Sequence, residues 1–200
     1  MSDEVLSAPS WAREQLAEYA RAAGAMAERL PAVLRVAELL CRAFAAGGVV
    51  YAFGNGGSAA DAQHLTGELI GHYRRDRRPL PAVTLTCDPT VMTCIGNDYS
   101  FDDAFARQVE ALARPGDVVI AFTTSGRSPN VVAGLAAARA RGATTVLFGG
   151  ASGGPAAEHA DVLLAAPATA TARVQELHTL MLHLVSEHVD AWAAGETPTP

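Results

Sequence analysis

Four side chains on two predicted helices have the types and the spacing of an acid–base or metal site. His64 and Glu68 are four residues apart, which places both on one face of a helix, about one turn from each other. Gln175 and His183 are eight residues apart, or two turns with a small angular drift. Such groups form mixed nitrogen–oxygen sites for Zn²⁺, and a carboxylate beside an imidazole can also transfer protons. Spacing alone leaves an ordinary interpretation open, in which each histidine is a core or surface residue and Glu68 pairs with a base such as Arg74.

Two loops have the composition of a phosphate site. The segment Gly54–Ser58 is rich in glycine, which lets the backbone turn tightly and bring its N–H groups close to an anion at the start of the next helix. The segment Thr123–Asn130 offers four hydroxyls around one glycine, again before a helix. Either loop alone could be a plain turn with nothing bound. Two such loops at one edge of a sheet favour a binding site for a phosphate monoester.

A dinucleotide site is a weaker interpretation of the first loop. Gly54, Gly56 and Ala59 match the loose G-x-G-x-x-A pattern. The next predicted strand, however, does not end in the acidic residue that would bind the ribose hydroxyls, since Asp88 lies beyond it and is followed by Pro89. No lysine follows the glycines, so the Walker pattern fails too.

Hydrophobic patterning predicts the elements that must position these groups. Residues 10–46 have the apolar spacing of two helices, broken near Pro31. Short apolar runs then predict five strands, at 49–53, 82–86, 117–122, 144–148 and 162–165. Between them we expect helices at 59–73, with Ser58 as N-cap, at 101–113, at 129–141, closed by Gly142, and at 171–193, with a loop between 86 and 101.

Apolar strands that alternate with helices indicate an α/β protein with a parallel sheet covered on both faces. Ligands bind to such sheets at the carboxyl ends of the strands, where both loops lie. Two hundred residues suit one domain, so we expect a single domain over 1–200, with N-terminal helices at about 10–46, an α/β core at about 47–194 and a flexible tail at 195–200. The extra apolar area of the N-terminal helices favours an oligomer.

Bulk composition indicates a cytoplasmic enzyme or binding domain. Half of the residues are apolar and 18% are charged, with a net charge of −6, so a basic face for nucleic acid is not expected. The three cysteines form no C-x-x-C pair and indicate reduced thiols. The N-terminus has no signal-peptide pattern, and no apolar run reaches the length of a membrane span.

Four motifs in order resemble the phosphoheptose isomerases of the SIS (sugar isomerase) domain family. They are Gly54–His64 followed by Glu68, then Ile95–Asp98, then Thr124–Ser128, then Arg173–His178 followed by His183. The resemblance runs from about Trp11 to His188 and is more specific than any one motif. It implies a SIS fold, which is a flavodoxin-like three-layer sandwich with a five-stranded parallel sheet, in a homotetramer with active sites near subunit contacts.

The resemblance also implies a reaction and a set of site residues. These enzymes convert sedoheptulose 7-phosphate to D-glycero-D-manno-heptose 7-phosphate, and we expect proton transfer through an enediolate with Glu68 as base and His183 as acid. The Zn²⁺ ligands, one ion per subunit, would be His64, Glu68, Gln175 and His183. The substrate contacts would be Asn55, Gly56, Gly57, Ser58, Glu68, Asn97, Asp98, Thr123, Thr124, Ser125, Ser128 and Gln175.

Some features depart from this pattern or remain open. Arg127 stands where relatives carry Asn, and Ala172 stands where a polar residue is common. The run from Arg74 to Arg78 could attract anionic sugar phosphates, pair across subunits or be a solvated helix end. The alternative function is that of a non-enzymatic SIS protein, which binds the bacterial replication initiator or senses a sugar phosphate. The presence of both Glu68 and His183 favours the enzyme.

Overall fold

The centre of the fold is a five-stranded, entirely parallel sheet. The computed structural model describes residues 8–196, and its strand order is β2-β1-β3-β4-β5. The strands are β1 Val50–Gly54, β2 Ala82–Thr84, β3 Val118–Thr123, β4 Thr144–Gly149 and β5 Val162–Ala165. The predicted α/β class and the five parallel strands are confirmed.

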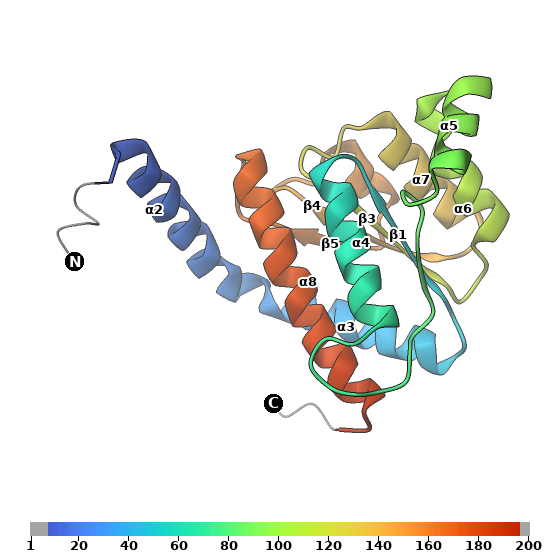
Figure 1. The fold of residues 1–200 in the computed structure, drawn as a ribbon, viewed down its shortest axis with the longest axis horizontal. Helices are drawn as coiled ribbons and strands as arrows, with labels where there is room; N and C mark the ends of the chain where they lie inside the picture. The colour runs from blue at the N-terminus through green and yellow to red at the C-terminus, as the bar shows by residue number, and fades with distance from the viewer. Residues whose placement is uncertain (1–7, 197–200) are drawn as a thin grey trace.

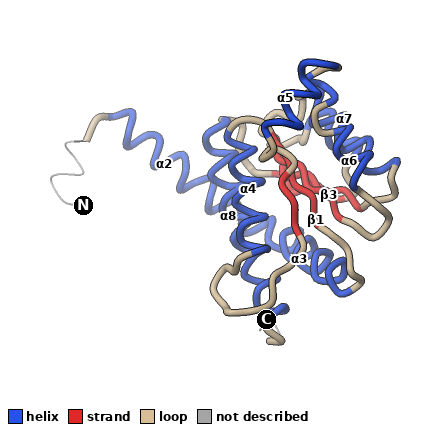
Figure 2. Tube along the Cα trace, turned by 45° about the vertical axis from the view of Figure 1, so that its right-hand side comes forward, coloured by secondary structure: helices blue, strands red, loops and turns tan. Residues whose placement is uncertain are grey.

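Helices cover both faces of the sheet and complete three layers (Figure 2). Helices α3 (Leu30–Ala45), α4 (Gly57–Ile70) and α8 (Thr171–Ala193) pack on one face, and α6 (Ala106–Leu112) and α7 (Pro129–Ala140) pack on the other. Alternate residues of each strand point to opposite faces. In β3, Ile120 and Phe122 therefore belong to the first core, whereas Val119 and Ala121 belong to the second. The predicted three-layer sandwich is confirmed.

The sheet reverses its direction of growth between β1 and β3, and this places the two predicted loops side by side. The chain leaves β1 through α4 to reach β2 on one side, and β3 lies on the other side of β1. The register pairs Gly54 of β1 with Phe122 of β3, so both strands end at the same edge. Such a reversal leaves a crevice at the carboxyl ends of the strands, which is where open α/β sheets bind ligands.

The N-terminal helices differ from each other in how they pack. Helix α2 (Ser10–Ala25) extends away from the body of the molecule, as Figure 1 shows, and the 3₁₀ turn η1 (Met26–Arg29) joins it to α3. The predicted break near Pro31 is confirmed, since this proline lies in the first turn of α3, where its missing N–H is not needed. Trp11 and Leu16 of α2 are 68% and 66% exposed.

Three predictions about local structure are wrong. The expected loop between 86 and 101 contains helix α5 (Pro89–Asp98), because the Asp88 carboxylate accepts hydrogen bonds from the backbone N–H groups of Thr90 and Val91. The expected helix at 101–113 is divided into the 3₁₀ turn η2 (Phe101–Asp103) and α6. Helix α4 begins and ends earlier than predicted, with Gly56 rather than Ser58 as N-cap, since the positive φ of Gly56 (56°) turns the chain two residues before the serine.

The remaining elements agree closely with the prediction. Helix α8 has the predicted bounds, and α7 ends one residue early, at Ala140, before Gly142 with its left-handed φ of 77°. A further 3₁₀ turn, η3 (Gly154–His159), precedes β5. Within residues 8–196, no helix is long and apolar enough to cross a membrane. Most of the expected tail at 195–200 lies outside the described residues.

Candidate active site

The loop after β1 brings the start of α4 against α8. A Cβ atom on Gly57 would lie 2.4 Å from the Gln175 side-chain nitrogen Nε2, so the contact between this loop and Gln175 requires glycine. Gly54 is similarly tight, since a Cβ there would lie 2.8 Å from the carbonyl oxygen of Phe122. The glycines therefore allow a close approach of the two strand ends and of the amide of Gln175.

A cavity of about 210 Å³ lies where β1, β3, α4, α7 and α8 meet. Hydroxyl and amide groups dominate its lining, and the helices α4 and α7 begin beside it, with their free backbone N–H groups and positive dipole ends. This hydroxyl-lined cavity has the chemistry of a phosphate site. Its lining residues are Asn55, Ser58, Phe122, Thr123, Thr124, Ser125, Ser128, Val131, Thr171 and Gln175.

Two asparagines join the loops on either side of this cavity. Asn55 Nδ2 donates to Asn130 Oδ1 at 2.8 Å, and Asn130 Nδ2 donates back to Asn55 Oδ1 at 3.0 Å. Asn130 is 1% exposed, and it lies in the first turn of α7, directly after Pro129. The pair therefore fixes the orientation of the Asn55 amide and the spacing of the two loops.

The predicted cluster on α4 and α8 forms in the structure. His64 Nε2 lies 3.1 Å from Glu68 Oε1 and 3.3 Å from His183 Nε2. One ligand atom from each of the three side chains lies within 4.8 Å of the others, and all three residues are half-buried. The α4 pair and the α8 imidazole thus converge on one point: spacing predicted that His64 and Glu68 share a helix face, and the packing of α8 against α4 adds His183.

Partial burial and neighbouring charges tune His183. Burial lowers the pKa of His183, the charge of His64 and that of Arg74 lower it further, and the carboxylate of Glu68 opposes them. A lowered pKa leaves the imidazole neutral near pH 7, so its free nitrogen can take up a proton or bind a cation. The ring of Tyr73 stacks on that of His183, with centroids 5.5 Å apart and planes 29° apart.

The donor atoms of this cluster suit a divalent metal ion. In the contact between His64 and His183 only one of the two facing nitrogens can carry the proton, so the other presents a lone pair. Lone pairs of imidazoles together with a carboxylate oxygen are the ligands that Zn²⁺ accepts. The three residues therefore form a possible metal site. Gln175, the fourth predicted ligand, lies two turns before His183 on α8 and contacts the loop at Gly57.

A buried pair joins α4 to α8 beside the cluster. His178 Nε2 lies 3.2 Å from the Gly149 carbonyl, which can only accept, so Nε2 carries the proton and Nδ1 presents a lone pair. That lone pair faces Asp61 Oδ2 at 4.0 Å, while Asp61 Oδ1 accepts from the Thr179 hydroxyl. Burial raises the pKa of Asp61 to about 6 and lowers the pKa of His178 to about 4. Burial thus favours the neutral form of each side chain, and the 4.0 Å between Asp61 Oδ2 and His178 Nδ1 is too long for a hydrogen bond.

Two predicted substrate contacts lie away from the hydroxyl-lined cavity. Asn97 and Asp98 form the last turn of α5, where Asn97 Nδ2 donates to Asp98 Oδ1 at 2.7 Å and both residues are exposed. Neither of them lines the cavity. The other predicted contacts either line it or belong to its glycine loop, apart from Glu68, which lies in the cluster.

Asn130, Thr171 and Tyr73 lie near the site and were not among the predicted residues, and neither were the apolar lining residues Phe122 and Val131. Asn130 orients Asn55, Thr171 lines the cavity, and Tyr73 stacks on His183. Asn130 had a signal in the sequence, since it follows proline at a helix start in a loop already expected to bind phosphate. Tyr73 had none, because the prediction placed it at the end of a helix rather than in a loop that folds back onto α8.

Comparisons with known proteins agree on one family. A family model described as the SIS domain matches residues 16–150. The phosphoheptose isomerase of Roseiflexus sp. (strain RS-1) is 49% identical over 160 residues, which cover 80% of this chain and 81% of that protein. The phosphoheptose isomerase of Paramagnetospirillum magneticum is 47% identical over 183 residues, which cover 90% and 95%. Among solved structures, phosphoheptose isomerase GmhA from Neisseria gonorrhoeae matches with a TM-score of 0.85 and 39% identity, over 90% of this chain and 97% of that one.

Proposed function

The chain belongs to the SIS-domain family of phosphoheptose isomerases, and we propose from this premise how its residues divide the work of the reaction. The activity is that of an aldose–ketose isomerase, which converts sedoheptulose 7-phosphate to D-glycero-D-manno-heptose 7-phosphate. The comparisons give no support to the alternative of a non-enzymatic SIS protein. The observation that carries the assignment of roles is the convergence of His183 with Glu68 and His64, which lie on the helix that begins at the hydroxyl-lined cavity.

The substrate phosphate binds in the hydroxyl-lined cavity. Hydroxyls of the second loop and free N–H groups at the starts of α4 and α7 would bind its oxygens. Because an α-helix rises 1.5 Å per residue, His64 lies about 9 Å along α4 from Ser58 at the cavity. An open seven-carbon chain with a phosphate at one end spans a distance of this order. The arrangement therefore supports a phosphate in the cavity and a carbonyl end at the cluster.

Glu68 and His183 transfer the protons. The Glu68 carboxylate removes a proton from C1 of the ketose while His183 protonates the carbonyl oxygen on C2, which gives the cis-enediol. His183 then takes the proton from the oxygen on C1, and Glu68 returns its proton to C2, which gives the aldose. A neutral His183, which its lowered pKa favours, carries one N–H proton, which it gives to the oxygen on C2, and the nitrogen left without a proton then takes the one from the oxygen on C1. Gln175 would hold a substrate oxygen between the cavity and the cluster.

We propose Zn²⁺ as the metal of this site, one per subunit. His64, Glu68 and His183 would bind it, and Gln175, the fourth expected ligand, would have to turn from Gly57 toward the cluster to join them. When bound, the ion would act as a Lewis acid toward the substrate carbonyl. Coordination would also lower the basicity of Glu68, so the carboxylate would have to leave the ion, or share it through one oxygen, when it acts as base.

We further propose a single domain over 1–200 that assembles as a cytoplasmic homotetramer, with no nucleic-acid or membrane partner. The extended helix α2, with its exposed Trp11 and Leu16, supports assembly, because large apolar side chains on an isolated helix are usually covered by another chain. Light scattering of the purified protein would measure the subunit number.

The activity is tested with a panel of five-, six- and seven-carbon ketose phosphates. Each is incubated with the purified protein, and the aldose phosphate is identified by mass spectrometry after chemical trapping of the aldehyde. We expect turnover with sedoheptulose 7-phosphate. Absence of turnover with that substrate, in protein loaded with Zn²⁺ and in protein freed of metal, would contradict the proposed function.

A further inference from the structure

Two buried opposite charges hold the loop that follows α4. The Asp190 side chain is fully buried in α8, and the Arg77 side chain is 1% exposed in the loop between α4 and β2. Arg77 Nε donates to Asp190 Oδ1 at 2.9 Å. Arg77 belongs to the basic run at 74–78, which therefore lies in this loop, beyond the end of α4, and not at a helix end.

Asp190 accepts from the loop backbone as well as from Arg77. Its carboxylate oxygens accept hydrogen bonds from the N–H groups of Tyr73 at 3.2 Å, Arg74 at 3.0 Å and Arg75 at 2.7 Å. Burial alone would raise the pKa of Asp190, but these N–H groups and Arg77 outweigh it and lower the pKa, so the carboxylate is charged. One carboxylate thus fixes three consecutive residues of a loop without regular structure.

Arg77 fixes the end of the helix that carries Glu68. Its Nη2 donates to the main-chain carbonyl of Glu68 at 2.6 Å, and its Nη1 donates to that of Leu69 at 2.7 Å and that of Arg78 at 2.9 Å. The last carbonyls of a helix have no partner within the helix, and a cation there also faces the negative end of the helix dipole. Arg77 is therefore a cap on the last turn of α4.

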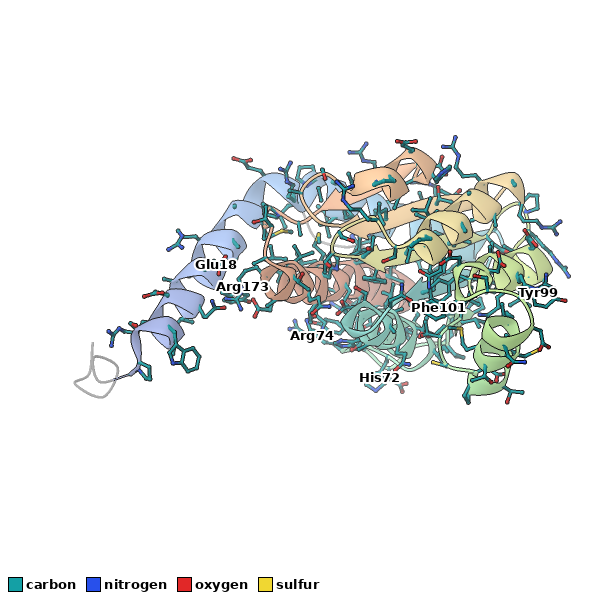
Figure 3. The ribbon with its side chains drawn as sticks, turned by 90° about the horizontal axis from the view of Figure 1, so that it is seen from above. Glu18, His72, Arg74, Tyr99, Phe101 and Arg173 are labelled. Carbon is teal, nitrogen blue, oxygen red and sulfur yellow. The ribbon has the colours of Figure 1, made fainter. Side chains whose placement is uncertain are left out.

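The loop held by this pair also contacts the second catalytic group. Tyr73, whose N–H bonds to Asp190, stacks on the imidazole of His183. Asp190 itself lies seven residues, or about two turns, after His183 on α8. Figure 3 shows Arg74, the next residue of the loop, beside α4 and α8. The same two charges are thus connected to Glu68 through the main chain and to His183 through the tyrosine ring.

We propose that Asp190 and Arg77 are positioning residues for the acid–base site, and that they hold the Glu68 carboxylate and the His183 imidazole at the separation that proton transfer requires. This inference rests on the proposed function, because it assigns the purpose of the pair from the roles of Glu68 and His183. A buried ion pair is a poor source of stability, since well-packed apolar residues often do as well in its place. Five hydrogen bonds of the pair go instead to the two parts of the chain that place the catalytic groups, three to the loop at 73–75 and two to the last turn of α4.

The adjacent arginines provide a matched pair of variants. Arg77→Gln removes the buried guanidinium, whereas Arg78→Gln removes the same charge from an exposed side chain that lies over the ring of Trp192. Asp190→Asn tests the other partner, because an amide cannot accept from all four donors. Circular dichroism and thermal unfolding identify the variants that fold.

Two measurements separate positioning from a purely structural role. The first is the kinetic split: in folded Arg77→Gln and Asp190→Asn we expect kcat to fall by about tenfold to a hundredfold, because a misplacement of 1 Å can cost a factor of that order. KM should change by less than about threefold, because the phosphate binds in the distant cavity. The second is the NMR signal of the His183 ring protons in ¹³C-labelled protein, assigned with His183→Gln. Loss of the Tyr73 stack should move this signal in both variants and leave it in place in Arg78→Gln.

Tyr73→Leu keeps the pair and removes only the stacked ring. This variant tests the proposal if neither Arg77→Gln nor Asp190→Asn folds. A lower kcat of Tyr73→Leu together with a displaced His183 signal then supports the proposal. Wild-type kcat and His183 signal in any folded Arg77→Gln or Asp190→Asn variant would overturn it, as would an equal loss of kcat in Arg78→Gln. If the wild-type protein has no isomerase activity, the proposed function fails, and the His183 signal still tests whether the pair positions that ring.

Discussion

Replacement of Glu68 by glutamine is the change that bears most directly on the chemistry. Glutamine has the volume of glutamate and keeps an oxygen that can accept from His64, which lies 3.1 Å from Glu68 Oε1. The fold should therefore persist, with an unfolding temperature close to that of the wild type. What is lost is the ability to take a proton from carbon. A positioned general base contributes about 10²- to 10⁴-fold, so kcat should fall by that factor, equivalent to about 2.7 to 5.5 kcal/mol in activation free energy.

The assay is conversion of sedoheptulose 7-phosphate at saturating substrate, followed by mass spectrometry of the trapped aldose. KM should change little, because the phosphate binds in the hydroxyl-lined cavity, whose lining does not include Glu68. Glu110→Gln, at an exposed position of α6, is the matched control and should keep wild-type kcat. A folded Glu68→Gln variant with kcat within about threefold of the wild type would refute the assignment of the base, since such a change is far below the expected contribution.

Three further predictions test other parts of the site. His183→Ala should lower kcat by about 10²- to 10⁴-fold in a folded protein, and near wild-type turnover would disprove its role as acid. Asn130→Ala leaves Asn55 without its two hydrogen bonds, so the free energy of unfolding measured in urea should fall by about 1 to 3 kcal/mol. KM should rise by a larger factor than kcat falls, and an unchanged KM would show that Asn55 does not contact substrate. Asp61→Asn concerns pH: folding raises the pKa of this carboxyl from 3.8 to about 6, so the folded wild type keeps a proton that the unfolded chain releases, and its stability falls as pH rises through that window. The stability of Asp61→Asn relative to the wild type should therefore increase from about pH 4 to about pH 6 and then level off, and thermal unfolding that shows a constant difference across this range would contradict the raised pKa.

The sheet and the last helix could be predicted because their buried positions are mostly apolar. Strand β3 is buried along its whole length between two helical layers, so every residue from Val118 to Phe122 is apolar and the pattern resembles no other element. Helix α8 has a buried, mostly apolar stripe from Val174 to Val189, which identifies it without tertiary information.

Helix α5 could not be predicted in the same way. Ile95 is its only buried residue, so the helix has almost no apolar stripe. What stabilises its start is Asp88 as N-cap followed by Pro89, a local signal that is visible in the sequence. Without an apolar stripe to follow it, this cap alone does not predict a helix.

The acid–base cluster could be predicted in part from the sequence, whereas the pair of Arg77 and Asp190 could not. His64 and Glu68 share a helix face, so their spacing alone predicts that they meet. Arg77 and Asp190 are 113 residues apart, and each looks like an ordinary charged residue of a polar segment. Only the return of the loop after α4 onto α8 brings them together and buries them, and neither helical periodicity nor composition contains that information.

A crystal structure of the Glu68→Gln variant with sedoheptulose 7-phosphate bound tests the central claim most directly. We predict the phosphate among the hydroxyls of the loop at 123–128, with C1 and C2 of the sugar within hydrogen-bond reach of the side chain at position 68 and of His183 Nε2. A substrate whose phosphate lies in the cavity while C1 and C2 point away from both side chains would contradict the account, as would a phosphate bound elsewhere on the chain.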